Sequence, residues 1–265
     1  MKKIVVSTNC ACVDVFVEKG EIRPGGEALN FCGNCCQDPD LDVYFMGAIG
    51  EDEYGQAILD KLKDYPIGRD YLKIEKGVTA NHKIWHTKEG DRYFKEGSWT
   101  DGVYGDYSLG EAEKAFLLKA DAVHTSVNAP VLPQILKLKE QGAFFLAVDF
   151  NERREFESWE PFMGKVDAFF ISGSEDIMEK LMEWSRRFDT IFIATLAEKG
   201  SIAFWKGERY ECAAEPVEKV VDTTGAGDSY QAGFLSSYIK NRDLKKAMEA
   251  GSRQAAQNIS HLGGF

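Results

Sequence analysis

Short apolar runs alternate with longer helix-like stretches along most of this chain, and no other feature restricts its fold as much. The apolar runs lie at 4–7, 43–48, 122–127, 144–150, 168–172 and 190–196. The run from Phe144 to Val148 does not alternate between apolar and polar residues, which is typical of a parallel strand buried on both faces. Helices are expected at 27–36, 54–65, 110–119, 132–141, 175–188, 229–240 and 244–260. The pattern predicts an α/β fold with a mostly parallel sheet, in one domain that spans residues 1–265.

Two segments break this alternation. Residues 201–213 have the pattern of a β-hairpin with Lys206 and Gly207 at its turn. Residues 72–107 are rich in aromatic and charged residues and contain two short strand-like runs, at 83–87 and 92–94. We therefore expect a separate β structure over this second segment.

The composition argues against several classes of function. The chain has 265 residues and a formal net charge of −11, which disfavours nucleic acids and acidic membranes as main partners. No apolar run is long enough to cross a bilayer. The N-terminal apolar run ends at Ser7 and is too short for the core of a signal peptide, so a cytoplasmic protein is expected.

The six cysteines raise the question of a metal site. Cys10 and Cys12 form a Cys-x-Cys pair, and Cys32 and Cys35 form a Cys-x-x-Cys pair. Zinc would need four ligands in a compact site, whereas the second pair falls on an expected helix and Cys212 is distant in sequence. Reduced thiols are therefore favoured over a structural metal. The four histidines show no metal-ligand spacing either.

The segment Asp222-Thr-Thr-Gly-Ala-Gly-Asp228 carries the strongest chemical signal. Its glycines let the backbone approach a ligand closely, and the helix that follows offers free N–H groups and its positive dipole end. The amides of Gly225, Ala226 and Gly227 would form an anion hole, and Asp228 would take a proton from an attacking hydroxyl. This combination suits phosphoryl transfer. The alternative is a glycine-rich turn whose aspartate only caps the helix.

Five motifs in a fixed order resemble those of the ribokinase-like (PfkB-type) carbohydrate kinases. They are Gly25-Gly26-Glu-Ala-Leu-Asn30, Gly47-Ala-Ile-Gly50-Glu-Asp52-Glu-Tyr-Gly55, Asp149-Phe-Asn151-Glu-Arg153, Thr195-Leu-Ala-Glu-Lys-Gly200 and the segment that ends at Asp228. The likeness runs from residue 14 to the C-terminus. It implies an ATP-dependent sugar kinase with a ribokinase-like three-layer fold. It also implies a small β lid contributed by about residues 10–24 and 72–107, which closes over the sugar and often forms a homodimer surface.

The resemblance implies roles for individual residues. Asp228 would be the catalytic base beside the anion hole of Gly225, Ala226 and Gly227. Sugar hydroxyls would bind Asp14, Gly25, Gly26 and Asn30. The nucleotide would lie against Thr195, Glu198 and Gly200, with Asn258 near the adenine; a solvated helix position is the alternative for Asn258.

Two metal ions are implied as well. Magnesium is needed to neutralise and orient the ATP phosphates, and Glu175 would organise its water ligands. The family usually has Asn-x-x-Glu here, whereas this chain has Ser172 in place of the asparagine. Asp222 and Thr224 would hold a monovalent cation such as K⁺, with loop capping as the alternative.

Within the family, the chain is similar to the fructoselysine 6-kinases. The residues that carry this likeness are Cys12-Val-Asp14, Gly77-Val-Thr-Ala80, Asp91-Arg92-Tyr-Phe94, Gly102-Val103, Asp106-Tyr-Ser-Leu109 and the terminal His261-Leu-Gly-Gly-Phe265. The likeness implies phosphorylation of the 6-hydroxyl of a sugar–amino acid conjugate, with Arg92 and Glu96 near the amino acid. A solvated strand face is the alternative for those two residues. Two other functions stay open: a kinase for another free sugar, of the fructokinase or ribokinase type, and a catalytically silent sugar-binding regulator.

Overall fold

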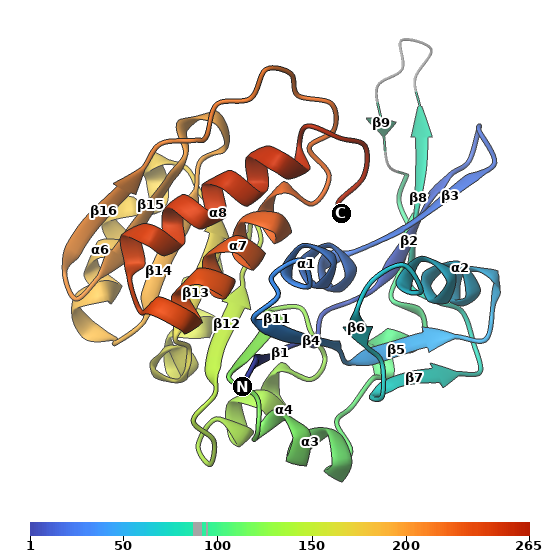
Figure 1. The fold of residues 1–265 in the computed structure, drawn as a ribbon, viewed down its shortest axis with the longest axis horizontal. Helices are drawn as coiled ribbons and strands as arrows, with labels where there is room; N and C mark the ends of the chain where they lie inside the picture. The colour runs from blue at the N-terminus through green and yellow to red at the C-terminus, as the bar shows by residue number, and fades with distance from the viewer. Residues whose placement is uncertain (87–91, 94) are drawn as a thin grey trace.

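The computed structural model describes residues 1–86, 92–93 and 95–265, and a nine-stranded sheet forms its centre (Figure 1). The strand order is β16-β15-β14-β13-β12-β11-β1-β4-β6. Neighbours from β6 to β14 are parallel, whereas β15 and β16 are antiparallel. The strands are β1 (Lys3–Ser7), β4 (Leu41–Phe45), β6 (Ile67–Gly68), β11 (Ala122–Ser126), β12 (Phe145–Asp149), β13 (Ala168–Ser172), β14 (Ile191–Thr195), β15 (Ser201–Trp205) and β16 (Glu208–Cys212).

The predicted mostly parallel sheet and the hairpin at 201–213 are confirmed. One predicted strand is wrong. The run at 43–48 is two strands, because the chain leaves the main sheet after β4 and continues as β5 (Gly47–Gly50). There β5 pairs in parallel with β7 (Leu72–Glu75) in a separate two-stranded sheet.

Helices cover both faces of the central sheet. The α-helices are α1 (Glu27–Cys35), α2 (Glu53–Leu62), α3 (Glu111–Leu117), α4 (Leu132–Leu138), α5 (Phe156–Trp159), α6 (Met178–Arg187), α7 (Ala226–Asn241) and α8 (Leu244–Asn258). Short 3₁₀ helices are η1 (Gly102–Asp106), η2 (Glu160–Lys165), η3 (Glu175–Ile177) and η4 (Ala197–Lys199). One core contains apolar residues of α1, α2, α7 and α8, and a second core contains those of α3 to α6. The three-layer arrangement expected from the resemblance is thus present.

Two α-helices start three residues away from their predicted starts, for physical reasons. The helix expected at 229–240 begins three residues earlier, at Ala226, because Gly225 adopts the left-handed conformation (φ 71°) and acts as the N-cap. The helix expected at 175–188 begins with the 3₁₀ turn η3 and becomes α-helical at Met178. The short α5 and η2 were not predicted, since four to six residues are too few to show helical periodicity.

Helix α1 is buried almost all round. Eight of its nine residues, Ala28 to Cys35, are buried. It packs against β4 on one side and against α7 on the other. The helix therefore joins the N-terminal third of the chain to the C-terminal one.

A second sheet projects from the edge of the main body beside α1 and α2 (Figure 1). Its order is β10-β8-β2-β3, and β9 also pairs with β8. The strands are β2 (Cys12–Phe16), β3 (Glu21–Gly25), β8 (Asn81–His86), β9 (Arg92–Tyr93) and β10 (Trp99–Thr100). A separate β structure was predicted here, but with wider bounds. Residues 72–75 belong to the β5–β7 sheet, and Tyr104 and Tyr107 are buried in the second core.

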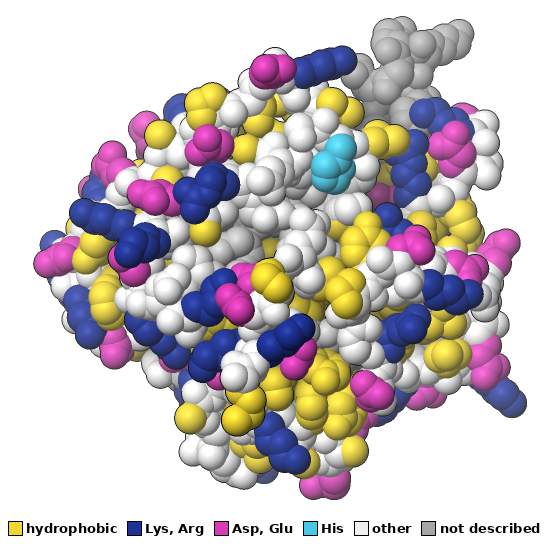
Figure 2. All heavy atoms as spheres, viewed as in Figure 1, with side chains coloured by type: hydrophobic (Ala, Val, Ile, Leu, Met, Phe, Trp, Pro, Cys, Tyr) yellow, Lys and Arg dark blue, Asp and Glu magenta, His cyan; other side chains and the backbone are white. Residues whose placement is uncertain are grey.

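Charged side chains of both signs are interspersed over the face shown in Figure 2, without a continuous basic surface on that face. Within the described ranges, none of the helices combines the length and the apolar character that a membrane span requires. All six cysteines are free thiols.

Candidate active site

Four strands that lie side by side end at the same edge of the central sheet with a polar residue. Ser126, Asp149, Ser172 and Thr195 are the last residues of β11, β12, β13 and β14. Each of them lines one of two cavities at this edge. Ligands of open α/β sheets bind outside the carboxyl ends of the strands, so this edge is the candidate site.

The two cavities share a wall. Cavity A, of about 510 Å³, is lined by Cys10, Cys12, Gly26, Trp99, Asp101, Tyr104, Ser126 and Ala129. Cavity B, of about 490 Å³, is lined by residues that include Asp149, Asn151, Ser172, Thr195, Gly225, Ala226, Gly227, Asp228 and Gln231. Glu27, Asn128 and Arg153 line both. A ligand pair could therefore lie end to end across these three residues.

The start of α7 presents backbone donors to cavity B. The N–H of Ala226 bonds Thr223 O at 3.2 Å, and that of Ser229 bonds Gly225 O at 2.8 Å. Between them, the N–H groups of Gly227 and Asp228 have no acceptor in the described part of the chain. Unpaired amides at a helix N-terminus form an anion site. Of the predicted donors, Gly225 and Gly227 have N–H groups without an acceptor in the described part of the chain, whereas that of Ala226 is paired with Thr223 O. The anion hole stays a prediction.

Asp228 lies at this helix start, and a hydrogen bond restrains its carboxylate. The amide Nδ2 of Asn30 donates to Asp228 Oδ2 at 2.9 Å. Burial raises the pKa of Asp228 well above its usual range, and the nearby charges of Glu27 and Asp149 raise it further. A carboxylate of higher pKa is a better proton acceptor for a hydroxyl, provided that it is ionised at the working pH.

A chain of polar contacts lies behind Asp228. The amide Nδ2 of Asn151 donates to Glu27 Oε1 at 2.9 Å, and the backbone N–H of Asn151 donates to Asp149 Oδ1 at 2.8 Å. The other oxygen of Asp149 accepts from Gln231 Nε2 at 2.7 Å. Gln231 Oε1 lies 2.8 Å from Nε2 of His124, whose ring is buried and whose pKa burial lowers to about 4. The neutral imidazole thus donates to Gln231 and fixes the orientation of its amide.

Of the predicted sugar residues, only Gly26 lines cavity A, and Gly25, Asn30 and Asp14 lie outside its lining. Gly26 has a φ of 90°. A Cβ at this position would lie 2.8 Å from both Cys10 O and Cys12 N, so there is no space for a side chain. Gly25 is the last residue of β3, and Asn30 lies one turn into α1. Asp14 lies in the central strand β2, two residues after Cys12, between its pairing partners Arg23 and His82. These positions are consistent with sugar binding, which stays a prediction.

The predicted cation residues form a loop that is closed by hydrogen bonds. Asp222 Oδ1 accepts from the N–H of Thr224 at 3.0 Å and from its hydroxyl at 2.7 Å, and Asp222 Oδ2 accepts from Gly263 N at 3.2 Å. The side chain of Asn258 is buried and donates to Thr224 O at 2.7 Å. Asn258 therefore supports the loop that carries Gly225. Its predicted contact with adenine and the predicted cation at Asp222 and Thr224 stay predictions.

The other predicted residues lie at the border of the site. Thr195 lines cavity B, Gly200 turns the chain with φ 90°, and Glu198 is exposed on η4. Glu175 is exposed on η3, outside the cavity wall, whereas Ser172 is part of that wall. The side chain of Arg92 lies outside the described part of the structure, so its role stays a prediction. Glu96 is exposed.

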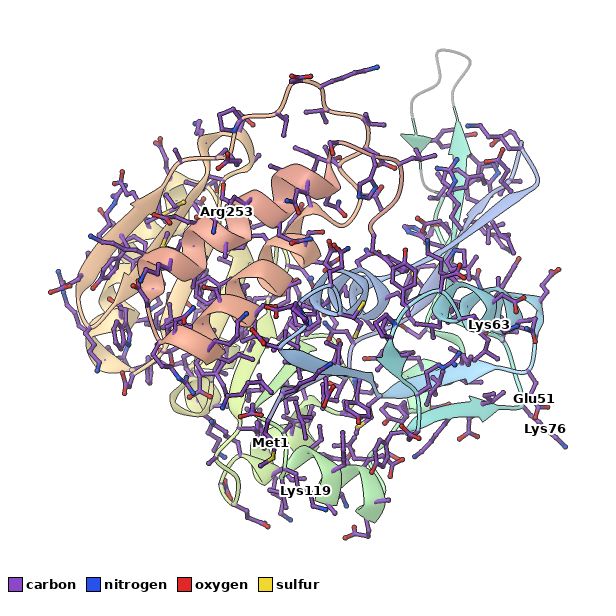
Figure 3. All side chains as sticks on the ribbon, viewed as in Figure 1. Met1, Glu51, Lys63, Lys76, Lys119 and Arg253 are labelled. Carbon is purple, nitrogen blue, oxygen red and sulfur yellow. The ribbon has the colours of Figure 1, made fainter. Side chains whose placement is uncertain are left out.

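A third space, cavity C, lies between residues 215–221 and α8. It has about 540 Å³ and is lined by Pro216, Val217, Val221, Ala256 and other residues that include Arg253. Figure 3 shows Arg253 on α8, at the opposite end of the molecule from Glu51 and Lys76. The segment 221–225 joins cavity C to the start of α7.

Sequence reasoning missed Glu27, Asn128 and Gln231 as site residues. Glu27 lies inside the Gly25–Asn30 motif, and Gln231 lies one helical turn after Asp228, so their spacing could have indicated them. Asn128 follows β11 by two residues, without any motif around it. Only the packing of β11 beside β12 shows that it reaches the site, where its Nδ2 donates to Asn151 Oδ1 at 2.8 Å.

Comparison with known proteins agrees with this geometry. Residues 7–264 match the model of the pfkB family carbohydrate kinases. Fructoselysine 6-kinase of Escherichia coli is 29% identical over 96% of both chains. A fructosamine kinase of Bacillus subtilis is 27% identical over 100% of this chain and 93% of its own. A 2-dehydro-3-deoxygluconokinase of Haemophilus influenzae also matches, over 90% of this chain.

Among solved structures, ribokinase of Arabidopsis thaliana, complexed with ribose and ATP, aligns with a TM-score of 0.82. It is 18% identical, and the alignment covers 99% of this chain and 94% of that one. The fold is therefore ribokinase-like. Since the family model spans nearly all of the sequence, the chain belongs to the pfkB family of carbohydrate kinases.

Proposed function

We propose that this protein transfers the γ-phosphoryl group of ATP to a primary hydroxyl of a fructosamine such as fructoselysine, at its 6-position. The observation that carries the proposal is the pair of unpaired N–H groups at Gly227 and Asp228, beside the Asp228 carboxylate, in a cavity that shares a wall with cavity A. Sugar in cavity A and phosphate in cavity B would bring the acceptor hydroxyl and the phosphorus together at Asp228.

The reaction needs few steps from the protein. As the sugar oxygen bonds to the γ-phosphorus, the bond from that phosphorus to the bridging oxygen of ADP breaks, and Asp228 takes the hydroxyl proton. The amides of Gly227 and Asp228 stabilise negative charge on the transferring group. Asn30 holds the carboxylate in place through its 2.9 Å hydrogen bond. The products are ADP and a sugar phosphate.

Magnesium would neutralise and orient the phosphates. In the described residues, no group of three or more His, Cys, Asp and Glu side chains converges in an arrangement that could hold a metal ion. The residues fit an ion that is held by phosphates and water, with Glu175 at the border of the site as a partner of the water ligands.

The two glycines of the anion site give a matched pair of variants. A Cβ at Gly225 would lie 2.8 Å from Gly264 Cα and 3.0 Å from Asn30 Nδ2, at a positive φ, whereas a Cβ at Gly227 would meet nothing within 4 Å. Gly225→Ala should therefore destabilise the fold by at least about 1 kcal/mol, and Gly227→Ala should not. Both should raise KM for ATP or lower kcat, because Gly225→Ala displaces the loop before the anion site and the methyl group of Gly227→Ala enters the open space beside that site. Urea unfolding and ATP kinetics check this; equal stability of the two variants would contradict it.

The adenine of ATP would occupy cavity C, whose apolar wall contains Val217, Val221 and Ala256. Ala256→Trp fills this space and should raise KM for ATP about tenfold or more, while kcat at saturating ATP and KM for the sugar stay close to those of the original protein. Initial-rate kinetics with each substrate varied in turn measure this. An unchanged KM for ATP would place the adenine elsewhere.

The fructosamine is favoured over other sugars by the likeness to fructoselysine 6-kinase and fructosamine kinase across nearly the whole chain. An ADP-release assay over fructoselysine, fructose, ribose and 2-keto-3-deoxygluconate tests it, with phosphorus–proton NMR to locate the phosphate. Turnover of one of the free sugars without any fructosamine would reject the substrate but not the kinase. If ATP is consumed but no sugar of this panel is phosphorylated, the protein hydrolyses ATP. If no ATP is consumed with any of these sugars, a catalytically silent regulator is favoured.

The second sheet is proposed as the lid and as a homodimer surface. It carries exposed apolar side chains on three strands and one turn, with exposed fractions of 42% for Val17, 39% for Ile22, 39% for Tyr93 and 42% for Trp99. Apolar side chains gathered on one projecting element mark an interaction surface. Trp99 also lines cavity A, so the same element borders the sugar.

A further inference from the structure

Glu27 is a charged side chain that the chemistry above does not use, although it lies at the centre of the site. It is the first residue of α1 and lines both cavity A and cavity B. Its carboxylate is therefore placed to touch a sugar that spans the boundary between the two cavities.

Within the described residues, this carboxylate accepts hydrogen bonds from Asn151 and Ser126 but forms no ion pair. Glu27 Oε1 accepts from Asn151 Nδ2, while no lysine or arginine within the described residues forms a salt bridge with Glu27. Arg153, a cation on the same cavity wall, already bonds Asn128 Oδ1 at 2.9 Å and the carboxylate of Glu155 at 3.0 Å. The negative charge of Glu27 is thus not matched by a lysine or arginine in the described part of the chain.

Two carboxyl groups near Glu27, those of Asp149 at the end of β12 and Asp228 on α7, increase this excess of negative charge, and Asp101 at η1 lies on the wall of cavity A. The thiols of Cys10 and Cys12 and the phenol of Tyr104 add none, because burial raises their pKa values. Burial, and after it the charge of Asp149, raises the pKa of Glu27 to about 7. A ligand with a positive charge would relieve this repulsion, whereas a neutral sugar would not.

We propose that Glu27 is a specificity residue that forms an ion pair with the ammonium group of an amino-substituted sugar, and this rests on the proposed function. No three metal-ligating side chains converge among the described residues, so these contacts do not favour a metal ion as the partner. An ammonium needs only one carboxylate and neighbouring acceptors, which Glu27 and Asp101 on the wall of cavity A supply.

The kinetic test compares 1-amino-1-deoxyfructose with fructose, which differ by one ammonium group in place of a hydroxyl. The original protein should prefer the amino sugar in kcat/KM. Glu27→Gln should reduce that preference at least about tenfold, since close charge pairs commonly contribute that much. Glu53→Gln is the matched control, because Glu53 is the exposed first residue of α2, and it should leave the preference unchanged.

The pH dependence gives a second readout. Glu27 must be ionised to bind an ammonium, so the preference should fall as pH decreases through about 7. Calorimetry of 1-amino-1-deoxyfructose binding without ATP, in buffers of different ionisation enthalpy, should show release of roughly one proton at pH 6 and little at pH 8. Glu27→Gln should lose most of this proton release.

The failures can be distinguished. If the original protein phosphorylates fructose and neither amino sugar nor fructoselysine, the proposed substrate is wrong. If it phosphorylates amino sugars, but Glu27→Gln lowers kcat/KM equally for 1-amino-1-deoxyfructose and fructose and keeps the proton release, the proposed substrate is retained. The role of Glu27 is then overturned. Glu27→Asp keeps the charge and should retain part of the preference, which guards against a merely structural loss.

Discussion

Asp228→Asn should lower kcat by about 10²–10⁴, the usual contribution of a general base, with a small change in KM. The variant keeps the size of the side chain and its oxygen, so Asn30 can still donate to position 228. It loses the proton acceptor. Initial-rate kinetics with the sugar varied would measure this, and a kcat within threefold of the original would remove Asp228 from the mechanism.

The same variant should not be less stable. The pKa of Asp228 is raised in the folded protein, so the ionised carboxylate costs stability once the pH rises above the unfolded value. Asparagine is neutral at every pH and removes this cost. We therefore expect a Tm at pH 8 equal to or above that of the original, together with the large loss of kcat. In the original protein, kcat/KM should fall as pH decreases through the raised pKa, above the range of an ordinary aspartate.

A control for Asp228→Asn is available at another helix start. Asp243 is the N-cap of α8 and accepts from Lys246 N at 3.1 Å, outside the three cavities described above. Asp243→Asn preserves the cap, because asparagine caps helices about as well as aspartate. Its kcat should equal that of the original. A parallel loss in both variants would indicate a general effect of removing a charge.

Shortening the second sheet should abolish sugar phosphorylation while leaving the ATP site in place. The backbone N–H of Lys83 bonds Ser98 O at 2.8 Å, so a short Gly-Ser linker can replace residues 84–97. This design keeps β7, η1 and the buried Tyr104, which a deletion of 72–107 would remove from the core. Water could then reach the phosphate, so ATP hydrolysis should rise relative to transfer.

The shortened variant tests closure and assembly separately. Unchanged kcat/KM for the sugar would show that residues 84–97 are not part of a lid. Light scattering measures the mass, which should shift toward that of a monomer. Of the exposed apolar side chains named above, only Tyr93 lies within 84–97, so an unchanged oligomeric mass would reject residues 84–97 as part of the dimer surface. Replacing the Lys206-Gly207 turn of the β15–β16 hairpin by Asn-Gly is the matched control, because it alters a turn of the other sheet.

The fold could be predicted largely because its buried strands carry their own signal. Runs such as 144–148 are apolar throughout, and most runs are separated from the next one by a helix that the periodicity indicates. The boundaries that were predicted wrongly depend on the backbone conformation of one residue or on pairing with a distant strand. Gly225 starts α7 early through a left-handed φ, and the 43–48 run divides because β5 finds a partner, β7, some 25 residues later. Neither cause appears in local periodicity.

The site could be predicted only in part, for a related reason. The segment from Asp222 to Asp228 is contiguous, so its glycines and carboxylate are visible together in the sequence. The network of Glu27, Asn128 and Gln231 is not contiguous, because its members come from α1, the loop after β11 and α7. Only the strand order of the sheet brings them to one edge.

The contact between α1 and α7 has a consequence for synthesis of the chain. The hydrogen bond from Asn30 to Asp228 joins residues 198 positions apart, and eight of the nine residues of α1 are buried. While a ribosome is still making the middle of the chain, α7 does not yet exist, and the apolar side chains of α1 have no partner there. Nascent chains of this length are prone to aggregation, so we expect a chaperone to bind at α1. Substitutions on α1 should therefore reduce the yield of folded protein in cells more than they reduce the stability of the finished molecule.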